Sequence, residues 1–364
     1  MAIERSLYTP PLSVEDDAVG DVLEIELEVP EVSLLDDGGA EITLVEEVDT
    51  LTSAPFDANL AEYLDDGQLV ELSTELVAAV ESDTQSRKEW ADTFVKGLEV
   101  LGFSYENRTE PWEDACGVYS TVLAEAAIRF QAEAMSETFP AAGPVKTQIL
   151  GEITQDKEDA ALRVRTDMNY ELTDVMVEYR PEHERMLYSL GLAGSAFKKI
   201  YFDPSLDRQV ALYVPAEDMI VPYGASNLET AERVTHVMRK TKNEMVKLQA
   251  AGFYRNVELG EPVTFFTDIE EEKAREGGFS LNSDDRYTLY EVHADLVLDE
   301  VDEAEREDPR GMGLARREQS DNRDELQIAK PYVVTIEQGT GTVLAVRRNW
   351  NPDDPLTLKR QHFV

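Results

Sequence analysis

Residues 182–242 constrain the fold of this chain most, because helix, strand and turn signals agree along the whole stretch. Apolar residues at helical spacing predict a helix over 182–190. The small residues 191–196 end that helix and let backbones approach closely. Strands are then predicted over 197–202, 209–214, 218–221 and 233–238, with turns at Pro204, Pro215 and Pro222 and a short helix capped by Asn227. We expect these strands to form one meander that packs on the helix.

Helical periodicity dominates the region before this stretch. Predicted helices cover 59–64, 68–82, the segment from Asp83 or Thr84 to Gly102, 114–137, and the segment from Thr154 to about 179. Trp90 and Phe94 lie on the predicted inner face of the third of these helices. Pro140 and Pro144 set the break before Thr154, and Pro181 separates the last of these helices from the helix over 182–190.

The region after the central stretch is richer in strands. A helix capped by Thr241 and closed by Gly252 is followed by a charged helix over 267–276. Strands are predicted over 287–299, 330–337 and 342–349, the last two as a hairpin. Residues 359–364 resemble a strand that is only beginning, so we expect more chain beyond Val364.

The predicted fold class is α+β, with long N-terminal helices packed on a mixed or antiparallel β platform. The expected divisions are an acidic arm (1–55), a helical region (56–153), an α+β core (154–260) and a β-rich region (261–364) with a charged insertion over 299–329. Within the arm, 22–29 and 41–48 alternate acidic and aliphatic residues, which indicates strands. A partly ordered arm and a disordered one both remain open.

The charge of the chain limits its partners. Its 75 acidic and 34 basic residues give a net charge of −41, which argues against wrapping DNA through phosphate contacts. Three explanations remain: a general adaptation to solubility or salt, a flexible acidic arm, or a DNA conduit whose wall repels phosphates so that the duplex slides.

The residues that could carry chemistry do not form motifs. The four histidines, His183, His236, His293 and His362, have no second ligand at helical spacing, so we expect core or surface roles. Cys116, near the start of a predicted helix, has no dedicated base, and Ser120 and Ser195 lack the context of a nucleophile elbow. We therefore predict no catalytic residue, cofactor-binding residue or metal ligand.

Phosphate loops and membrane segments are also missing from the sequence pattern. The glycines at 339–341 are not followed by Gly-Lys-Ser/Thr, and those at 311–313 lack the helix of a dinucleotide site. No apolar run approaches the ~20 residues of a membrane span, and the single cysteine allows no internal disulfide. We predict a non-enzymatic protein without cofactors that is soluble and cytoplasmic when made.

Basic residues concentrate in the middle of this acidic chain, where they could meet the acidic arm of a neighbouring subunit; simple solvation is the alternative. They are Arg163, Arg165, Lys198, Lys199, Arg233, Arg239, Lys240, Lys242 and Lys247.

The run SLGLAGSAFKKIYFDPSLDRQVALYVPAEDMIVPYGASNLETAERVTHVMRKTKNEM (189–245) resembles the wing region of portal proteins from short-tailed bacteriophages. The likeness includes a proline-acid strand (214–218), a turn (221–225) and an R-V-x-H-x-x-R strand (233–239). VLAEAAIRFQAEAMSETFPAAGPVKTQI is similar to the family's long N-terminal helix, and LKRQHFV resembles the approach to its stem. The resemblance covers roughly residues 85–300.

The resemblance implies a structural subunit of a ring, usually of twelve copies, at one capsid vertex. DNA would be packed and ejected through its channel, and a separate terminase motor would supply the force. Implied partners are other copies of the chain, capsid and scaffolding proteins, the terminase, tail adaptors, and double-stranded DNA bound without sequence specificity. The implied location is the virion, and the host cytoplasm during assembly. The alternative is an acidic α+β interaction module of a halophilic or marine source, with no viral role.

Overall fold

The computed structural model describes residues 31–34, 40–43, 54–101, 105–108, 110, 112–113, 115–118, 120–203, 206–262, 266–281, 286–298 and 329–364. Its contacts divide the chain into two units, Met1–Val48 and Asp49–Val364. In the first unit, β1 (Glu31–Leu34) pairs antiparallel with β2 (Ala40–Thr43). The predicted strand over 22–29 and the charged insertion lie outside the described residues, and the predicted strand over 41–48 is described only to residue 43, within β2.

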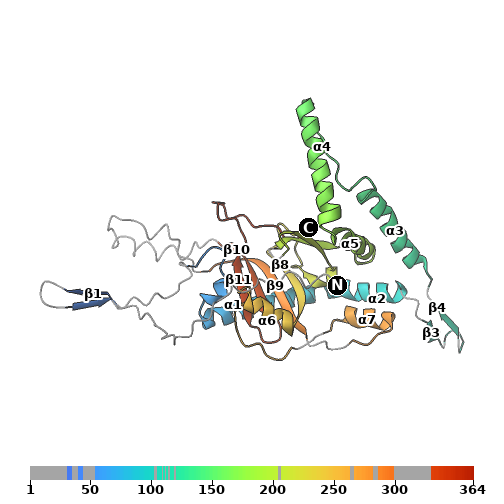
Figure 1. The fold of residues 1–364 in the computed structure, drawn as a ribbon. Helices are drawn as coiled ribbons and strands as arrows, with labels where there is room; N and C mark the ends of the chain where they lie inside the picture. The colour runs from blue at the N-terminus through green and yellow to red at the C-terminus, as the bar shows by residue number, and fades with distance from the viewer. Residues whose placement is uncertain are drawn as a thin grey trace, which may run out of the picture. The chain divides into compact units, whose positions relative to one another are not determined.

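A five-stranded antiparallel sheet forms the centre of the second unit (Figure 1). Its order is β11 (Val343–Arg348), β10 (Lys330–Glu337), β9 (Arg286–Leu296), β8 (Arg233–Thr241) and β7 (Met219–Ile220). The predicted hairpin is confirmed, since β10 pairs with β11. Both strands are almost continuously buried, which is typical of a sheet that is covered on both faces.

Helices cover the two faces of this sheet. On one face, α1 (Asp66–Ser86) contributes Leu72, Leu76 and Val80 to a core that includes Val292 and Val334. The other face is covered by α6 (Lys242–Ala250). Residues 290 and 292 of β9 belong to the first core and residues 287 and 289 to the second, as strand alternation requires. The fold is therefore α+β, as the sequence predicted.

The helix predicted after Thr241 and the charged helix predicted over 267–276 are both confirmed. Thr241 caps α6 and Thr267 caps α7 (Asp268–Gly277), each through a capping box with the glutamate three residues later. Trp90 and Phe94 on α2 (Lys88–Leu101) stack with ring centroids 5.4 Å apart and pack in one cluster with α7.

The predicted helix over 114–137 is wrong at its start. Residues Ala115–Val118 form β4, which pairs antiparallel with β3 (Tyr105–Arg108), and the helix α3 begins only at Val122 and extends to Thr138. Gly117 and the β-branched Val118 lower helix propensity there, and strand pairing satisfies their backbone groups.

The predicted break at Pro181 is also wrong. Helix α4 (Gln155–Tyr170) continues into a π-helical turn (Glu171–Val175), and α5 (Tyr179–Ala193) contains Pro181 in its first turn. Proline is tolerated there because the backbone N–H groups of the first turn have no partner within the helix. The small-residue end is confirmed, since Gly194 closes α5 with φ 78°.

The four central strands do not form one meander. Instead, β5 (Phe197–Asp203) and β6 (Arg208–Val214) form a separate two-stranded sheet, while β7 and β8 join the five-stranded sheet. The 3₁₀ turn Ala216–Asp218 redirects the chain between them. Arg87 holds this turn by donating to the carbonyl oxygens of Ala216 (2.9 Å) and Met219 (2.7 Å).

Two smaller expectations can be compared with the structure. Asn227 caps no helix: its side-chain oxygen accepts a hydrogen bond from the backbone N–H of Thr230 in a turn. The predicted start of a strand near residue 364 is confirmed by pairing with β5. The Lys198 N–H donates to the Val364 carbonyl and the Ile200 N–H to the His362 carbonyl, both at 2.8 Å. The predicted domain boundaries within 56–364 stay predictions.

Asn59 should be a stability determinant, because it bonds to backbone groups of β11 from the chain before α1. It is 5% exposed, donates to the Leu344 carbonyl (3.0 Å) and accepts from the Val346 N–H (2.9 Å). Asn59→Ala leaves both groups buried and unpaired, so we expect the free energy of unfolding to fall by about 3 kcal/mol in urea titrations. Exposed Asn227→Ala is the matched control, with an expected loss under about 1 kcal/mol. Equal losses would contradict this role.

Candidate functional site

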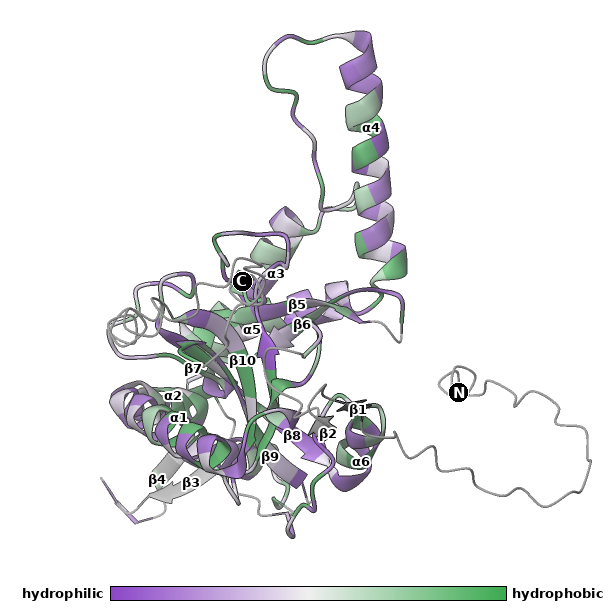
Figure 2. Cartoon of the chain, turned by 90° about the vertical axis from the view of Figure 1, so that its left-hand side faces the viewer, coloured by the Kyte–Doolittle hydropathy of each residue, from purple (hydrophilic) through white to green (hydrophobic). Residues whose placement is uncertain are grey.

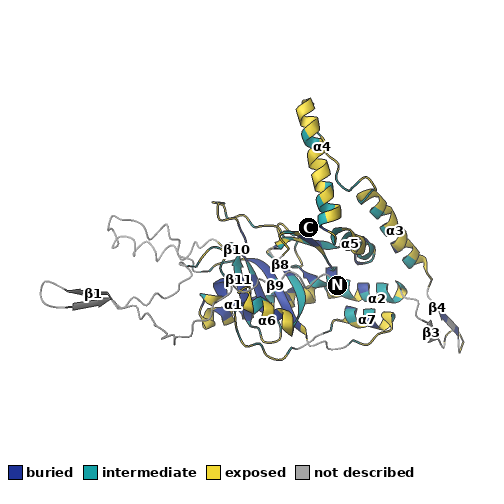
Figure 3. Ribbon diagram, viewed as in Figure 1, coloured by how far each residue is buried: buried dark blue, intermediate teal, exposed yellow. Residues whose placement is uncertain are grey.

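Helix α4 presents a long exposed surface in the described second unit. It has 16 residues, roughly 24 Å of helix, and none is buried. Figures 2 and 3 show it standing away from the sheet, mostly exposed and with apolar patches along its length. Leu162, Val164 and Met168 are about half exposed, at 51%, 50% and 47%. A helix of this length is marginal in water without packing, so this surface would gain stability from a partner.

Local contacts hold α4 near its middle and at its C-terminal end. Asn169 accepts a hydrogen bond from the Val145 N–H (2.9 Å), and Thr147 donates to the Ala161 carbonyl (3.2 Å). Beyond the π-helical turn, Glu178 binds Arg208 at 2.7 Å and so ties the start of α5 to β6. These contacts orient the helix but leave its apolar side chains uncovered.

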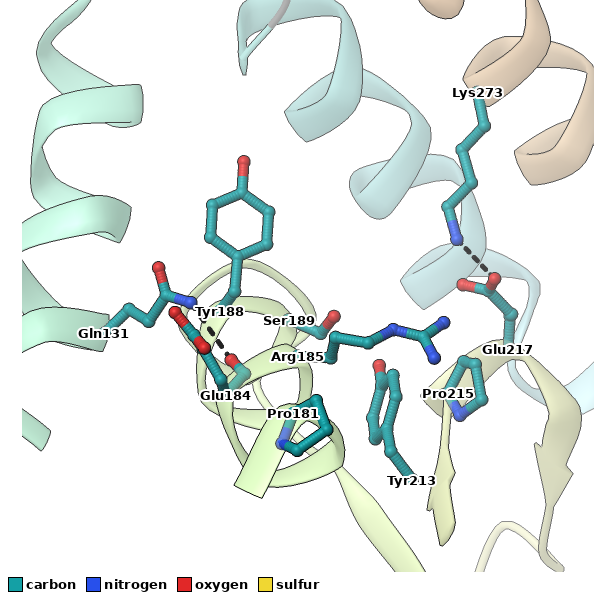
Figure 4. Close-up of a pocket in the computed structure, with 10 residues that line it drawn as sticks. All are labelled: Gln131, Pro181, Glu184, Arg185, Tyr188, Ser189, Tyr213, Pro215, Glu217 and Lys273. Atoms are coloured by element: carbon teal, nitrogen blue, oxygen red, sulfur yellow. Dashed lines mark hydrogen bonds and ion pairs between the residues drawn. The ribbon is translucent and has the colours of Figure 1, made fainter. Parts of the chain in front are cut away.

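A hollow of about 550 Å³ lies between α3, α5, β6 and α7 (Figure 4). Its cations are already paired: Lys273 with Glu217, and Arg185 with Glu182 at 2.9 Å. Gln131 donates to the Glu184 carbonyl across the hollow (3.1 Å). The balanced charges and the lack of a nucleophile beside a base among these lining residues do not favour anion binding or covalent catalysis.

Three of the four histidines meet in the structure, although they lie far apart in the sequence. His236 on β8 pairs with Glu291 on β9, and His293 lies two residues further along β9. The chain end adds His362, whose ring centroid lies 5.5 Å from that of His293. Within the described residues, no group of three or more His, Cys, Asp or Glu side chains is arranged to hold a metal ion. This cluster was not visible in the sequence because strand register creates it.

Glu291 is the anionic centre of this histidine cluster. Its oxygens accept from the Lys199 ammonium at 2.5 and 2.6 Å and from His293 Nε2 at 2.9 Å. Burial alone would raise the pKa of Glu291, but the hydrogen bond from His293 and the charge of Lys199 outweigh burial and lower it. The carboxylate therefore stays ionised in mild acid.

The other two imidazoles of the cluster are held neutral. Burial, with the charge of Lys199, lowers the pKa of His236 to about 4. Burial, with His293 and Lys199, lowers the pKa of His362 to about 4 as well. His236 Nδ1 is buried and has no hydrogen-bond partner among the described residues, so its site does not stabilise a charged ring.

His183, the fourth histidine, lies elsewhere, beside α3 and β5. Lys198 donates to its Nδ1 (3.1 Å), which places the ring proton on Nε2 toward the Thr138 hydroxyl (2.8 Å). Lys198 is 8% exposed, and burial lowers its pKa to about 8 although Glu182 opposes the shift. The ammonium lies 3.8 Å from the centre of the Tyr179 ring, which explains how a buried lysine is tolerated.

The remaining candidates from the sequence are dispersed. Cys116 lies in β4 and not near a helix start, so the thiolate argument from a helix terminus does not apply. Ser195 follows Gly194 at the end of α5, and Ser120 precedes α3. The central basic residues do not form one patch, because Arg233 binds Asp83 (2.9 Å) and Arg239 binds Glu270 (2.8 Å) within the chain.

Comparison with known proteins identifies no family for this chain. No protein-family model matches it, and no curated protein matches its sequence. Within the described part of the chain, no helix has the length and apolar character needed to cross a membrane. The function must therefore be inferred from the residues and their arrangement.

Proposed function

We propose that this chain is a structural subunit of a bacteriophage portal, a ring at one capsid vertex through which DNA is packed and ejected. The observation that carries the proposal is α4, a 16-residue helix without a single buried residue. A subunit of a ring must keep such a surface uncovered until its neighbour arrives. The resemblance of residues 189–245 to the wing region of portal proteins supports a portal ring as the assembly.

The charge of the chain supports a channel more than a binding surface. A net charge of −41 repels DNA phosphates, so a duplex would slide past the wall. Lys199, Arg233 and Arg239 each bind a carboxylate within the chain, which does not favour a basic patch that would hold DNA phosphates. Low affinity for DNA is what a conduit requires.

The partners follow from this role. Other copies of the chain would form the ring, and capsid and scaffolding proteins would surround it. A separate terminase would supply the force for packaging, and adaptor proteins would join the tail. Double-stranded DNA would pass without sequence readout. The assembled protein would reside in the virion, after assembly in the host cytoplasm.

Electron microscopy of the purified full-length protein tests the proposal. We expect rings with about twelvefold symmetry around a central channel, and a matching mass by analytical ultracentrifugation. A population that stays monomeric at concentrations of tens of micromolar would overturn the portal assignment. Such a result would favour a monomeric acidic interaction module instead.

A further inference from the structure

Residues 360–364 are the only described segment that extends the β5–β6 sheet, and they do so through three backbone hydrogen bonds. The N–H groups of Lys198 and Ile200 donate to the carbonyls of Val364 and His362, and the Val364 N–H donates to the Lys198 carbonyl at 2.9 Å. Residues 360–364, called the tail here, therefore form an antiparallel bridge beside β5, centred on the pair Lys199 and Phe363. A strand added at an edge is held by few bonds, so its side chains decide whether it stays.

Phe363 anchors the tail to the histidine cluster. It is 6% exposed, and its ring packs edge-on against His293 (centroids 5.1 Å apart) and His236 (5.7 Å). The Lys199 ammonium lies 5.6 Å from its centre. On the next residue back, His362 Nε2 donates to the Asn349 side-chain oxygen at 2.9 Å, so the neutral ring carries its proton there.

Cationic and protonatable groups outnumber the carboxylate around Phe363. The charged or titratable side chains that face this cluster are Lys199 and Tyr201 on β5, His236 and Lys240 on β8, Glu291 and His293 on β9, and Arg360 and His362 on the tail. Glu291 already neutralises Lys199. Any further proton on an imidazole therefore adds a positive charge that this set does not balance.

We propose that residues 360–364 form an acid-sensitive contact with the sheet, called the clasp here: neutral His236 and His362 help to hold Phe363 in place, and protonation of these two imidazoles releases residues 360–364 from β5. After release, the Lys199–Glu291 ion pair stays ionised and still joins β5 to β9. The clasp does not depend on the portal assignment, since every contact in it lies within one chain.

The direction of the effect follows from proton linkage. With the tail docked, the pKa of both His236 and His362 is about 4, compared with an ordinary value of 6.5. Between these two pH values, His236 and His362 bind protons when the tail is released but stay neutral when it is docked. Release of the tail therefore becomes more favourable as the pH falls from 6.5 toward 4. At pH 5, each imidazole freed by release shifts the equilibrium about 30-fold toward the released tail.

Hydrogen–deuterium exchange of the full-length protein at pH 7.5 and 5.0 tests the clasp, after correction for the intrinsic effect of pH on exchange. We expect protection of the tail to fall at least 30-fold at pH 5.0, while β9 and β10 keep theirs. Unchanged protection of the tail would overturn the proposal. Simultaneous loss of protection in the tail and in β9 would also overturn it, because that is global acid unfolding.

Single substitutions separate the clasp from general acid effects. His236→Phe keeps a ring against Phe363 but cannot take a proton, so we expect the pH response of the tail to shrink about 30-fold. His183→Gln, outside the cluster, should leave the response as in the unmodified protein. If His236→Phe does not fold, NMR titration of the unmodified protein decides: midpoints of 6.5 or above for His236 and His362 with the tail still docked would overturn the clasp.

Discussion

Val164→Asp on α4 is expected to prevent ring assembly and to leave the folded single chain intact. The side chain is 50% exposed in the single chain, so a carboxylate there remains hydrated and costs little before assembly. In a subunit contact the same carboxylate would lose its water without gaining a partner. Because each 1.4 kcal/mol changes an equilibrium tenfold, we expect the ring fraction in sedimentation velocity to fall at least tenfold.

Val70→Asp on α1 is the matched control for this experiment. Val70 is 65% exposed and also lies within a helix, so the change in side chain and in helix propensity is the same. Rings should form normally with this variant. If Val164→Asp also forms rings as readily as the unmodified chain, α4 is not a subunit contact. Rings in the unmodified protein would then still support the portal assignment.

The sequence predicted best those elements whose signals are local. Thr241 and Thr267 each precede a glutamate by three residues, and both start helices as predicted. The strands β9, β10 and β11 are runs of β-branched and aromatic residues between turns, and all three are present. In each case a few neighbouring residues carry enough free energy to decide the local structure.

The wrong predictions concern segments whose local structure depends on contacts with residues far away in the sequence. Pro181 is a helix breaker in the interior of a helix, but here α5 begins two residues before it, a position that the sequence did not reveal. The strand β4 was read as helix because its partner, β3, was not recognised. The meander is divided at the 3₁₀ turn between β6 and β7, and the backbone there accepts hydrogen bonds from Arg87, more than a hundred residues away.

The histidine cluster shows the same limit for a functional site. His236, Glu291 and His362 come from three segments, and only the register of β8 against β9 and the pairing of the tail with β5 bring them together. Spacing along the chain contains no information on register. The helix α4 was predicted from its sequence, in contrast, but only the structure shows that its apolar side chains Leu162, Val164 and Met168 are left about half exposed.

Glu291→Ala is expected to give the largest loss of stability among the substitutions considered, about 3–5 kcal/mol in urea unfolding at pH 7.5. The change leaves the Lys199 ammonium and the His293 N–H without their acceptor in a buried site. Glu99→Ala is the matched control, since Glu99 binds Arg275 at 3.4 Å at the surface, and its loss should stay below about 1 kcal/mol.

A second substitution distinguishes an uncompensated charge from lost packing. Lys199→Met in the Glu291→Ala background removes the buried ammonium that has lost its carboxylate partner. We therefore expect roughly half of the lost free energy of unfolding to return. Lack of any recovery would mean that the Glu291 side chain stabilises the sheet by its volume. Because the pKa of Glu291 is lowered on folding, its contribution is full above its ordinary pKa of 4.5 and declines only as the pH falls below that value. The stability difference between Glu291→Ala and the unmodified chain should therefore be constant from pH 8.5 to about pH 7.5, above the range in which the histidines take up protons.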